Sequence, residues 1–536
     1  MLTLSPYAIN AWRTPPGQVY AWIIPPYPAD AYAYRAWAMQ AYNGRWIFSL
    51  KFTASPNPAV IFLPFFLIVG KLARLSGADI GLVFLLAKSI GVCLFFAAFF
   101  AFLKQWRLTP SQSIAATVFV GCAAGLGGLA PLVFPAGLPL TWTPVDAWLV
   151  DSNTFWSLLW NPLYPYSLAL ILTAVACADR GARDCDAGAA WSSGLCLGML
   201  ALLHPYPLAV LYPLLTALCI GRRPKGWLPI LARIIVASLP TAGYVVAVAL
   251  LDPLMRAHNT LGTGGTVVLF AYASGFGLLP WLAVAGAAAG GREFLCRHWP
   301  LILWVALSAA LCSSPLWLHN KYIFGAHLPL CLLAGAAVDP LLARFGWRPS
   351  RAAAAAVLAF AAMPLTQFVH LREAVTAVTE NSDGEYRISI GMKTALDFLR
   401  AYSRPQDVVF AEPRTSGKIC AYSGNTVFWG HWAQSVDFDE RQDWIMGVLA
   451  ADSPLTPEQR RRQFWDAGMN YIFLDGSWRK LFKSEPAAAL LLGAEKIYGS
   501  NEVDIYRRAG DASSLANTDL QDSSAATSSG APISRR

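Results

Sequence analysis

Positive charge along this chain is confined to alternate gaps between long apolar runs. Five short gaps hold twelve Lys and Arg residues: Lys104 and Arg107; Arg180 and Arg183; Arg222, Arg223 and Lys225; Arg292 and Arg297; and Arg344, Arg348 and Arg351. The gaps 134–162, 252–265 and 318–322 hold two, Arg256 and Lys321. Because Lys and Arg are retained in the cytosol during membrane insertion, the first set predicts the inner side and the second the outer side. This asymmetry favours a bundle of helices that crosses a membrane many times.

The composition agrees with a membrane protein. Of the 536 residues, 56% are apolar and 14% are charged, whereas a soluble protein carries about a quarter charged residues. The net charge of +9 is compatible with nucleic-acid binding, but the basic residues are scattered among short gaps. Topology explains them better, and no nucleic-acid partner is expected. The ten cysteines show no CxxC spacing and are interpreted as small apolar residues.

Ten apolar segments reach or approach the roughly 20 residues that a helix needs to cross a bilayer: 80–103, 113–133, 163–178, 190–204, 206–221, 227–251, 266–290, 299–317, 323–341 and 352–369. Segments 190–204 and 206–221 share the break His204-Pro205-Tyr206-Pro207. If they formed one span, every later gap would change to the other side of the membrane, and the basic gaps would no longer share one side. We therefore interpret them as two short or partly re-entrant helices. Segment 58–75 is interpreted as a juxtamembrane helix in the outer interface, because a crossing there would place the basic gaps outside.

Ten crossings put residues 1–79 and the region after 369 on the outer side. The sequence thus predicts an outer N-terminal loop (1–79), a multi-helix transmembrane domain (80–369), an outer α/β domain (370–510) and a disordered tail (511–536). In the α/β domain, strands are expected at 407–410, 426–429, 471–475 and 503–506, and helices at 389–403, 441–451 and 457–468. The fold class is a polytopic α-helical membrane protein with about ten transmembrane helices and a soluble C-terminal α/β domain.

Carboxylates in two outer loops are candidates for acid/base chemistry. Asp30 opens a helical stretch that runs to Tyr42, and the second loop supplies Asp146 and Asp151. An Asp at such a position is also typical of a helix N-cap, and Asp151 with the next two residues is suited to the same role. Two acidic loops on one membrane face are what acid/base catalysis on a polar substrate requires, with one carboxylate as base and another orienting the acceptor or a cation.

Three basic side chains are expected near the same face. Lys88 lies about 12 Å from the outer end of its predicted helix, and Lys321 and His204 lie at outer boundaries. Together they would form a cationic rim suited to a lipid phosphate, since cations within apolar segments are costly. The alternatives are that Lys88 only anchors its helix by snorkelling and that His204 is a structural hydrogen-bond partner.

On these residues the chain resembles the GT-C superfamily of integral membrane glycosyltransferases, in particular the protein-mannosyltransferase and aminoarabinose-transferase type. The likeness covers most of residues 25–508 as a pattern. The stretches that carry it are PADAYAYRAWAMQAYNGRWIF, NPAVIFLPFF, DSNTFWSLLWNPLYP, the HPY break, NKYIFGAHLPLCLLAG and AYSGNTVFWGHW.

The resemblance implies an inverting glycosyltransferase that moves a sugar from a polyprenyl-phosphate carrier to an acceptor outside a bacterial cytoplasmic (inner) membrane. It assigns the base to Asp30, an assisting carboxylate to Asp151 rather than Asp146, and the lipid phosphate to Lys88 and Lys321. No GxGxxG fingerprint is found, which agrees with a lipid-linked donor. Family members carry a transmembrane helix before the Asp-bearing loop, and none is expected before Asp30. Ala31 follows Asp30 in place of a second acid, so a paired-acid metal site is not supported there, although a divalent cation stays open as a cofactor.

Two other functions are compatible with the sequence. One is a transporter or flippase of a lipid-linked glycan, but transporters tend to contain internal repeats and charges near the midplane, and no repeat is found. The other is a non-catalytic membrane scaffold, with Trp429 to Trp432 as an aromatic contact surface. We interpret that Trp-rich stretch rather as a strand packing on the membrane-facing surface.

Overall fold

The computed structural model describes residues 2–134, 137–223, 226–260, 267–316, 319–346, 364–381, 384–450, 452–483 and 485–509. The chain divides into two compact units. The helical unit comprises Met1–Ser49 and Asn57–Ser389, and the C-terminal unit comprises Leu50–Pro56 and Ile390–Arg536. The division follows Ser389, later than the expected boundary at 369, and it moves a segment of the predicted N-terminal loop into the C-terminal unit. The predicted tail at 511–536 lies outside the described residues.

Four helices of the described chain are long and apolar enough to cross a membrane, or five if one bent pair counts as a span. They are α4 (Ile80–Gln105), α11 (Leu228–Leu251), α14 (Leu279–Cys312) and the stretch His319–Phe345, which contains η4 (His319–Ile323), α15 (His327–Ala336) and α16 (Val338–Phe345). The bent pair is α5 (Pro110–Cys122) with η1 and α6 (Gly127–Val133), at 44°. The apolar segments at these places therefore form helices as expected.

Three shorter helices fill the predicted segments between α6 and α11. They are α8 (Tyr164–Asp184), α9 (Ala187–Leu203) and α10 (Leu208–Arg222), and they follow the short helix α7 (Thr154–Trp160). The break at 204–207 separates α9 from α10, as the sequence predicted. The tenth segment, 352–369, lies largely outside the described residues, so the count of ten crossings stays a prediction.

Helix α14 is two arms rather than one straight rod. Gly291 has φ 56° and ψ −142° inside it, a left-handed conformation that glycine adopts without a Cβ clash. The predicted segments 266–290 and 299–317 correspond to α13 (Leu269–Gly275) with the first arm, and to the second arm. The basic gap between those segments thus begins at this break.

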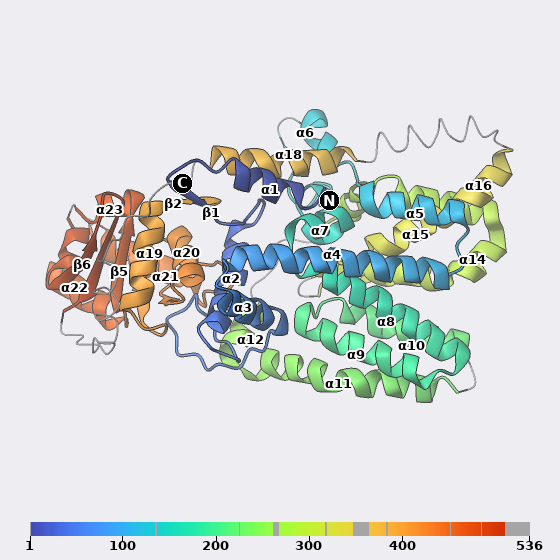
Figure 1. Ribbon diagram of the computed structural model, residues 1–536, viewed down its shortest axis with the longest axis horizontal. Coiled ribbons are helices and arrows are strands. Elements are labelled where there is room, and N and C mark those ends of the chain that lie inside the picture. Colours follow the sequence, from blue (N-terminus) through green and yellow to red (C-terminus); the bar gives the residue numbers. More distant parts are fainter. Residues whose placement is uncertain are drawn as a thin grey trace, which may run out of the picture. The chain divides into compact units, whose positions relative to one another are not determined.

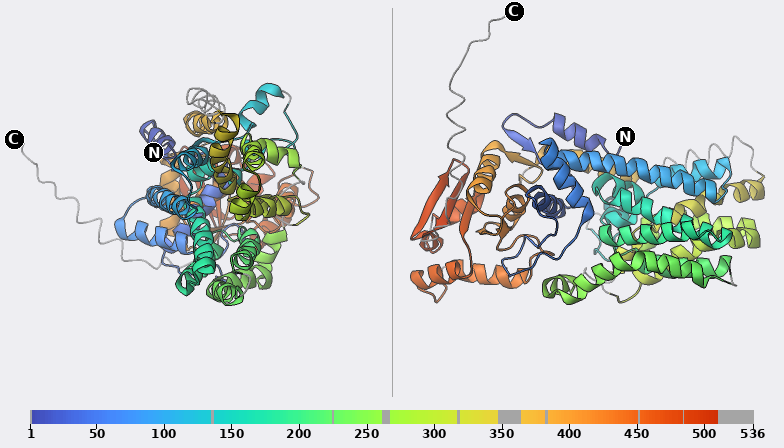
Figure 2. Two further views of the ribbon diagram at one scale, coloured as in Figure 1. Left: turned by 90° about the vertical axis from the view of Figure 1, so that its right-hand side faces the viewer. Right: turned by 60° about the horizontal axis from the view of Figure 1, so that its bottom comes forward.

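The described basic gaps lie together at one end of the helical unit. The connections from α4 to α5, from α10 to α11 and between the arms of α14 are at the right-hand end in Figure 1 and in the right panel of Figure 2. Arg297 Nη2 donates to the carbonyl of Arg107 at 2.5 Å. Asp179, buried in α8, accepts from Arg222 Nε of α10 at 2.9 Å and also pairs with Arg183. The one-sided placement that the sequence indicated is present in the fold.

The opposite end of the helical unit carries the elements of its first 80 residues together with three later ones. These are α1 (Ser5–Trp12), β1 (Gln18–Tyr20), α2 (Pro28–Tyr42), α3 (Pro64–Ser76), α12 (Pro253–Thr260), α18 (Leu365–Glu380) and β2 (Arg387–Ser389), which pairs antiparallel with β1. Helix α3 has 13 residues, a rise of about 20 Å, which is less than the roughly 30 Å hydrocarbon core of a bilayer. This length agrees with the juxtamembrane interpretation of segment 58–75.

The C-terminal unit is an α/β domain around a five-stranded sheet of order β4-β3-β5-β7-β6. Its strands are β3 (Val408–Phe410), β4 (Thr426–Val427), β5 (Tyr471–Asp475), β6 (Ala494–Gly499) and β7 (Val503–Arg508), and its helices are α19 (Ile390–Tyr402), α20 (Pro413–Tyr422), α21 (Phe438–Leu449), α22 (Pro457–Asp466) and α23 (Gly476–Leu481). β3 is parallel to β4 and β5, whereas β7 is antiparallel to β5 and β6. All four predicted strands and three predicted helices are found here, whereas α20 and β6 were not predicted.

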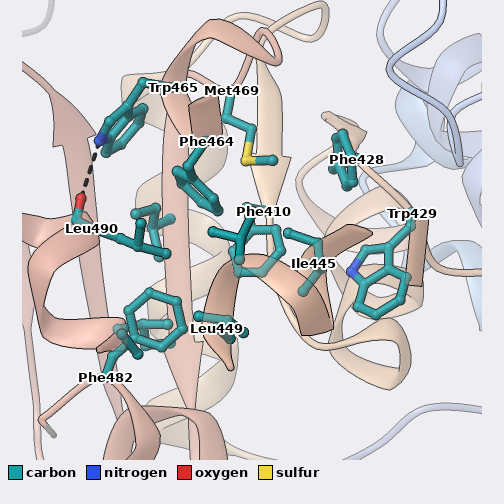
Figure 3. Close-up of a cluster of buried hydrophobic side chains, with 14 residues drawn as sticks. Phe410, Phe428, Trp429, Ile445, Leu449, Phe464, Trp465, Met469, Phe482 and Leu490 are labelled. Carbon is teal, nitrogen blue, oxygen red and sulfur yellow. Dashed lines mark hydrogen bonds between the residues drawn. The ribbon is translucent and has the colours of Figure 1, made fainter. Parts of the chain in front are cut away.

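Aromatic side chains form the core of this unit. Phe410, Phe464 and Phe482 are almost fully buried, and Trp429 lies in the same cluster (Figure 3). Trp429 Nε1 donates to the carbonyl of Ala411 at 2.9 Å, so this residue of the Trp-rich stretch serves packing rather than an exposed contact surface. Trp432, by contrast, is 57% exposed.

Residues Leu50–Pro56 are built into the C-terminal unit although they precede it by more than 300 positions. The backbone N–H of Val427 donates to the carbonyl of Lys51 at 2.9 Å. Lys51 Nζ donates to the carbonyl of Pro405 at 2.6 Å, and Phe52 is 1% exposed. Sequence reasoning placed this segment in a loop and missed its partners.

Candidate active site

Asp30 lies in the first turn of α2, at the end of the helical unit opposite the basic gaps. It is the third residue of the helix; the N-cap is Tyr27, which makes no side-chain cap. Asp30 is therefore not the N-cap residue that the local sequence also allowed. Its carboxylate in the first turn instead interacts favourably with the helix dipole. Helix α2 is fixed to the start of α4 by Arg35, whose guanidinium contacts both carboxylate oxygens of Asp79, at 3.0 and 2.5 Å.

Asp151 is buried and pairs with the half-buried Lys321. Its Oδ2 is 3.1 Å from Lys321 Nζ, and its Oδ1 accepts from the Tyr164 hydroxyl at 3.1 Å. His204 Nε2 is 3.9 Å from the same Oδ1. The cap of α7 is Asn153, whose side chain accepts from the N–H of Trp156. Asp151 is therefore not the cap of α7, a role that the sequence left open. Its carboxylate instead contacts Lys321, which is distant in sequence.

Tyr27 connects Asp30 to this pair electrostatically. Burial raises the pKa of Tyr27 to about 12; the charge of Lys321 lowers it, and the charges of Asp151 and Asp30 raise it. Burial likewise raises the pKa of Tyr34, and Asp30 and Asp151 raise it further. The structure therefore brings Asp30, Asp151 and Lys321 into one charged cluster, which we call the acidic cluster.

His204 is buried and packs against an aromatic ring. It lies in the break after α9 and its ring is stacked on Tyr164, with centroids 5.0 Å apart and planes at 8°. Burial lowers its pKa to about 4, although Asp151 raises it and Lys321 lowers it further. At neutral pH the imidazole is uncharged, and the place of His204 in the cationic rim stays a prediction. Its Nδ1 is buried without a hydrogen-bond partner among the described residues.

Lys88 is buried instead of reaching the interface. Its side chain in α4 is 1% exposed, and its ammonium donates to the carbonyl of Leu159 and lies 4.2 Å from the ring centroid of Tyr7. No ion pair between Lys88 and an acidic side chain is found in the described parts of the chain. A buried charge without a counter-charge is costly, and here a backbone carbonyl and an aromatic ring are the partners of the Lys88 side chain.

A small cavity of about 50 Å³ borders Lys88. Its lining is largely aromatic and includes Tyr7, Trp22, Tyr34, Phe84 and Trp160. This volume is well below the roughly 300–1,000 Å³ of small-molecule sites. The cavity offers an apolar enclosure with one ammonium in its wall.

Tyr34 and Trp160 belong to the boundary between the cavity and the acidic cluster, and sequence reasoning missed both. Tyr34 lines the cavity, accepts at its hydroxyl from Asn161 Nδ2 at 3.1 Å, and lies in the field of Asp30 and Asp151. Position i+4 from Asp30 in a predicted helix was the available signal, because such residues share a helix face. Tyr34 thus borders both the cavity at Lys88 and the acidic cluster.

Asp146 has a different environment from Asp151. It is 1% exposed, and its carboxylate accepts from the N–H groups of Gly125 and Gly127 at 2.8 and 3.1 Å. Burial raises its pKa to about 6, whereas the hydrogen bond of Thr366 and the N–H of Gly125 lower it. Asp146 holds the bend between α5 and η1. The Asp146 carboxylate is therefore occupied by backbone N–H groups, and the choice of Asp151 as the assisting carboxylate stays a prediction.

Among the described residues, no group of three or more His, Cys, Asp or Glu side chains is arranged to hold a metal ion.

The fold is shared with solved membrane transferases, whereas sequence comparisons find nothing. No protein-family model and no curated protein matches the chain. The structure is similar to ArnT from Cupriavidus metallidurans bound to undecaprenyl phosphate, with a TM-score of 0.51 at 12% identity, over 95% of this chain and 97% of that one. It is also similar to the arabinofuranosyltransferase AftD from Mycobacteria, with a TM-score of 0.50 at 13% identity, over 95% of this chain and 40% of that one. The chain spans about two fifths of AftD and nearly all of ArnT.

Proposed function

Because the chain has the fold of the GT-C glycosyltransferases, we propose that it transfers a sugar from a polyprenyl-phosphate carrier to an acceptor outside the cytoplasmic membrane. The observation that carries the proposal is the pairing of two sites in the helical unit. One is the acidic cluster, and the other is the aromatic cavity with the buried Lys88 ammonium.

The placement of charge supports an outer site. The basic gaps lie at one end of the bundle, and the positive-inside rule assigns that end to the cytosol. The acidic cluster lies at the other end, where Asp30 enters α2 and His204 follows α9. A lipid-linked donor keeps its phosphate at the membrane interface and its sugar in water, so donor and cluster would meet on the extracytoplasmic side.

The reaction that fits these groups is a displacement at the anomeric carbon. The acceptor hydroxyl loses its proton to the carboxylate of Asp30 and bonds to the anomeric carbon, while the bond from that carbon to the phosphate oxygen breaks and polyprenyl phosphate leaves. Attack opposite the leaving group inverts the configuration. General-base assistance of this kind contributes about 10²–10⁴-fold to the rate.

The remaining residues position and stabilise the groups that react. Lys88 neutralises the leaving phosphate, since a preorganised cation in a water-poor site stabilises developing negative charge. Asp151 is held by Lys321 and orients the acceptor beside Asp30. The similarity of the fold to ArnT, a structure solved with undecaprenyl phosphate bound, supports such a carrier.

Transfer from a radiolabelled polyprenyl-phosphate sugar in proteoliposomes tests the proposal. We expect Asp30→Asn to lower transfer about 10²-fold or more with an unchanged melting temperature. Asp184→Asn, an exposed carboxylate at the basic end, is the matched control and should transfer normally. Equal transfer by wild type and Asp30→Asn would remove Asp30 from the mechanism. Movement of the intact lipid across the bilayer without transfer would contradict the proposed function.

A further inference from the structure

The C-terminal unit contains an open groove that the proposed transfer does not use. Its volume is about 430 Å³, and it is lined by residues of Leu50–Pro56, the stretch after β4, α21 with its N-cap Asp437, and Ala467 after α22. All of its lining residues belong to the C-terminal unit. It lies within the size range of ligand sites, about 300–1,000 Å³.

Small residues make the space and aromatic residues bound it. Ala54 and Ala467 lie in the lining, where larger side chains would fill the groove. Phe428, which is drawn in Figure 3, and Trp444 stand 5.6 Å apart between ring centroids, with planes at 42°. Trp444 is half-buried, so one part of its indole packs on the unit and the rest faces the groove.

Two carboxylates line the groove together with Trp444. Glu440 and Trp444 are four residues apart in α21, which places them on one helix face, and Asp437 is the N-cap residue of the same helix. Both acids are exposed and both line the groove. An ionised carboxylate only accepts hydrogen bonds, so this rim favours a ligand that donates several.

Arg441, which also lines the groove, fixes its shape. Its guanidinium donates to the carbonyls of Val436 and Phe428 at 3.0 and 3.1 Å and to the Ser55 hydroxyl at 2.7 Å. The same group stacks on Phe428, 4.7 Å from the ring centroid. The segment from the first loop and α21 are thus tied together before any ligand arrives, and preorganisation of this kind lowers the entropy that binding costs.

We propose that this groove binds a saccharide chain. A pyranose ring has an apolar face of C–H groups and an edge of hydroxyl donors. The indole of Trp444 suits the face, since aromatic rings offer a large rigid contact area, and the carboxylates of Asp437 and Glu440 suit the edge. The alanines leave room for the ring, and the groove is open to solvent, so the rest of a chain can extend out of it.

Binding of short oligosaccharides to the full chain in nanodiscs tests this proposal. The probes are cellotetraose, chitotetraose and mannotetraose, followed by isothermal titration calorimetry. At least one of them should bind the wild type. Trp444→Ala should weaken that binding about tenfold, and Glu440→Gln about fivefold. Ala467→Leu, which fills the groove, should abolish the binding. This second variant keeps Trp444 intact, so the test still holds if Trp444→Ala does not fold.

Matched controls lie on the same unit. Trp432→Ala removes an exposed indole outside the groove, and Asp439→Asn removes an exposed carboxylate next to Glu440 on α21; both should bind like the wild type. The proposal is overturned if no oligosaccharide binds or if the groove variants bind like the wild type. It is also overturned if the cationic peptide pentalysine, and none of the oligosaccharides, binds in a manner that depends on Trp444. The readout is binding, so it stands apart from the proposed transfer, and either can fail without the other.

Discussion

Lys321 Nζ lies 3.1 Å from Asp151 Oδ2, across 170 positions of sequence. Asp151 is 4% exposed, so removing its cation leaves a buried carboxylate with the Tyr164 hydroxyl as a remaining hydrogen-bond donor. We expect Lys321→Met to destabilise the chain by about 3 kcal/mol and to lower transfer. The double variant Asp151→Asn/Lys321→Met should recover most of the melting temperature but none of the transfer. Equal melting temperatures for Lys321→Met and the wild type would show that the pair contributes nothing to stability.

Lys88 gives the opposite pattern, because its charge is buried without an acidic partner among the described residues. Replacing an uncompensated buried charge by an apolar group of similar length is neutral or stabilising. We expect Lys88→Met to keep or raise the melting temperature and to weaken binding of a polyprenyl phosphate about tenfold or more. Lys71→Met, in α3 outside the cavity, is the control. A large drop in melting temperature with unchanged lipid affinity would make Lys88 a structural residue.

The neutral imidazole of His204 predicts a flat pH response. Burial lowers the pKa of His204 to about 4, so the stabilisation that the neutral ring provides is present above its usual value near 6.5 and is lost as the pH falls through about 4. Between pH 5 and 8 the pH profiles of transfer by wild type and His204→Gln should have the same shape. His204→Lys should lower transfer about tenfold or more, because it adds a buried cation next to Lys321. A step near pH 6.5 in the wild type that His204→Gln removes would contradict this.

Asp146 predicts a pH-dependent stability with the opposite sign. Burial raises its pKa to about 6, so the folded state favours the protonated form, and the stability it provides is complete below pH 4 and is lost as the pH rises through about 6. The loss corresponds to about 3 kcal/mol. We expect the wild type to melt at lower temperature at pH 7 than at pH 5, and Asp146→Asn to show a flatter dependence. Asp252→Asn, a half-buried carboxylate that caps the N–H of Met255, should retain the wild-type slope.

Patterns that depend on neighbours in sequence were predicted well. The strand YIFLD is β5, Tyr471–Asp475, because β-branched and aromatic runs between polar turns have few other solutions. The break at His204 was found because two prolines follow it. The break at Gly291 divides α14 where the basic gap begins, and that gap indicated two helices rather than one.

Features that depend on distant partners were not predictable from one sequence. Sequence reasoning placed Asp30, Asp151 and Lys321 at one face, but the pairing of Lys321 with Asp151 requires the folded path of the chain. The place of His204 in the cationic rim stays a prediction; burial lowers its pKa, and that burial depends on the packing of Tyr164 and Phe324 around the ring. The burial of Lys88 likewise depends on packing by distant segments, whereas the sequence alone allowed its side chain to reach the interface. Their assignment to a reaction stays a prediction.

The seven residues Leu50–Pro56 constrain how this protein is synthesised and how it can be divided. They leave the ribosome long before Ile390, yet the amide of Val427 and the thiol of Cys420 both use the carbonyl of Lys51 as acceptor. The α/β domain therefore cannot be completed until nearly the whole chain has been translated. A fragment that starts at residue 390 would expose Phe428 and leave these donors unmatched. Fusions that exchange this domain between homologues need to carry the early heptapeptide with it.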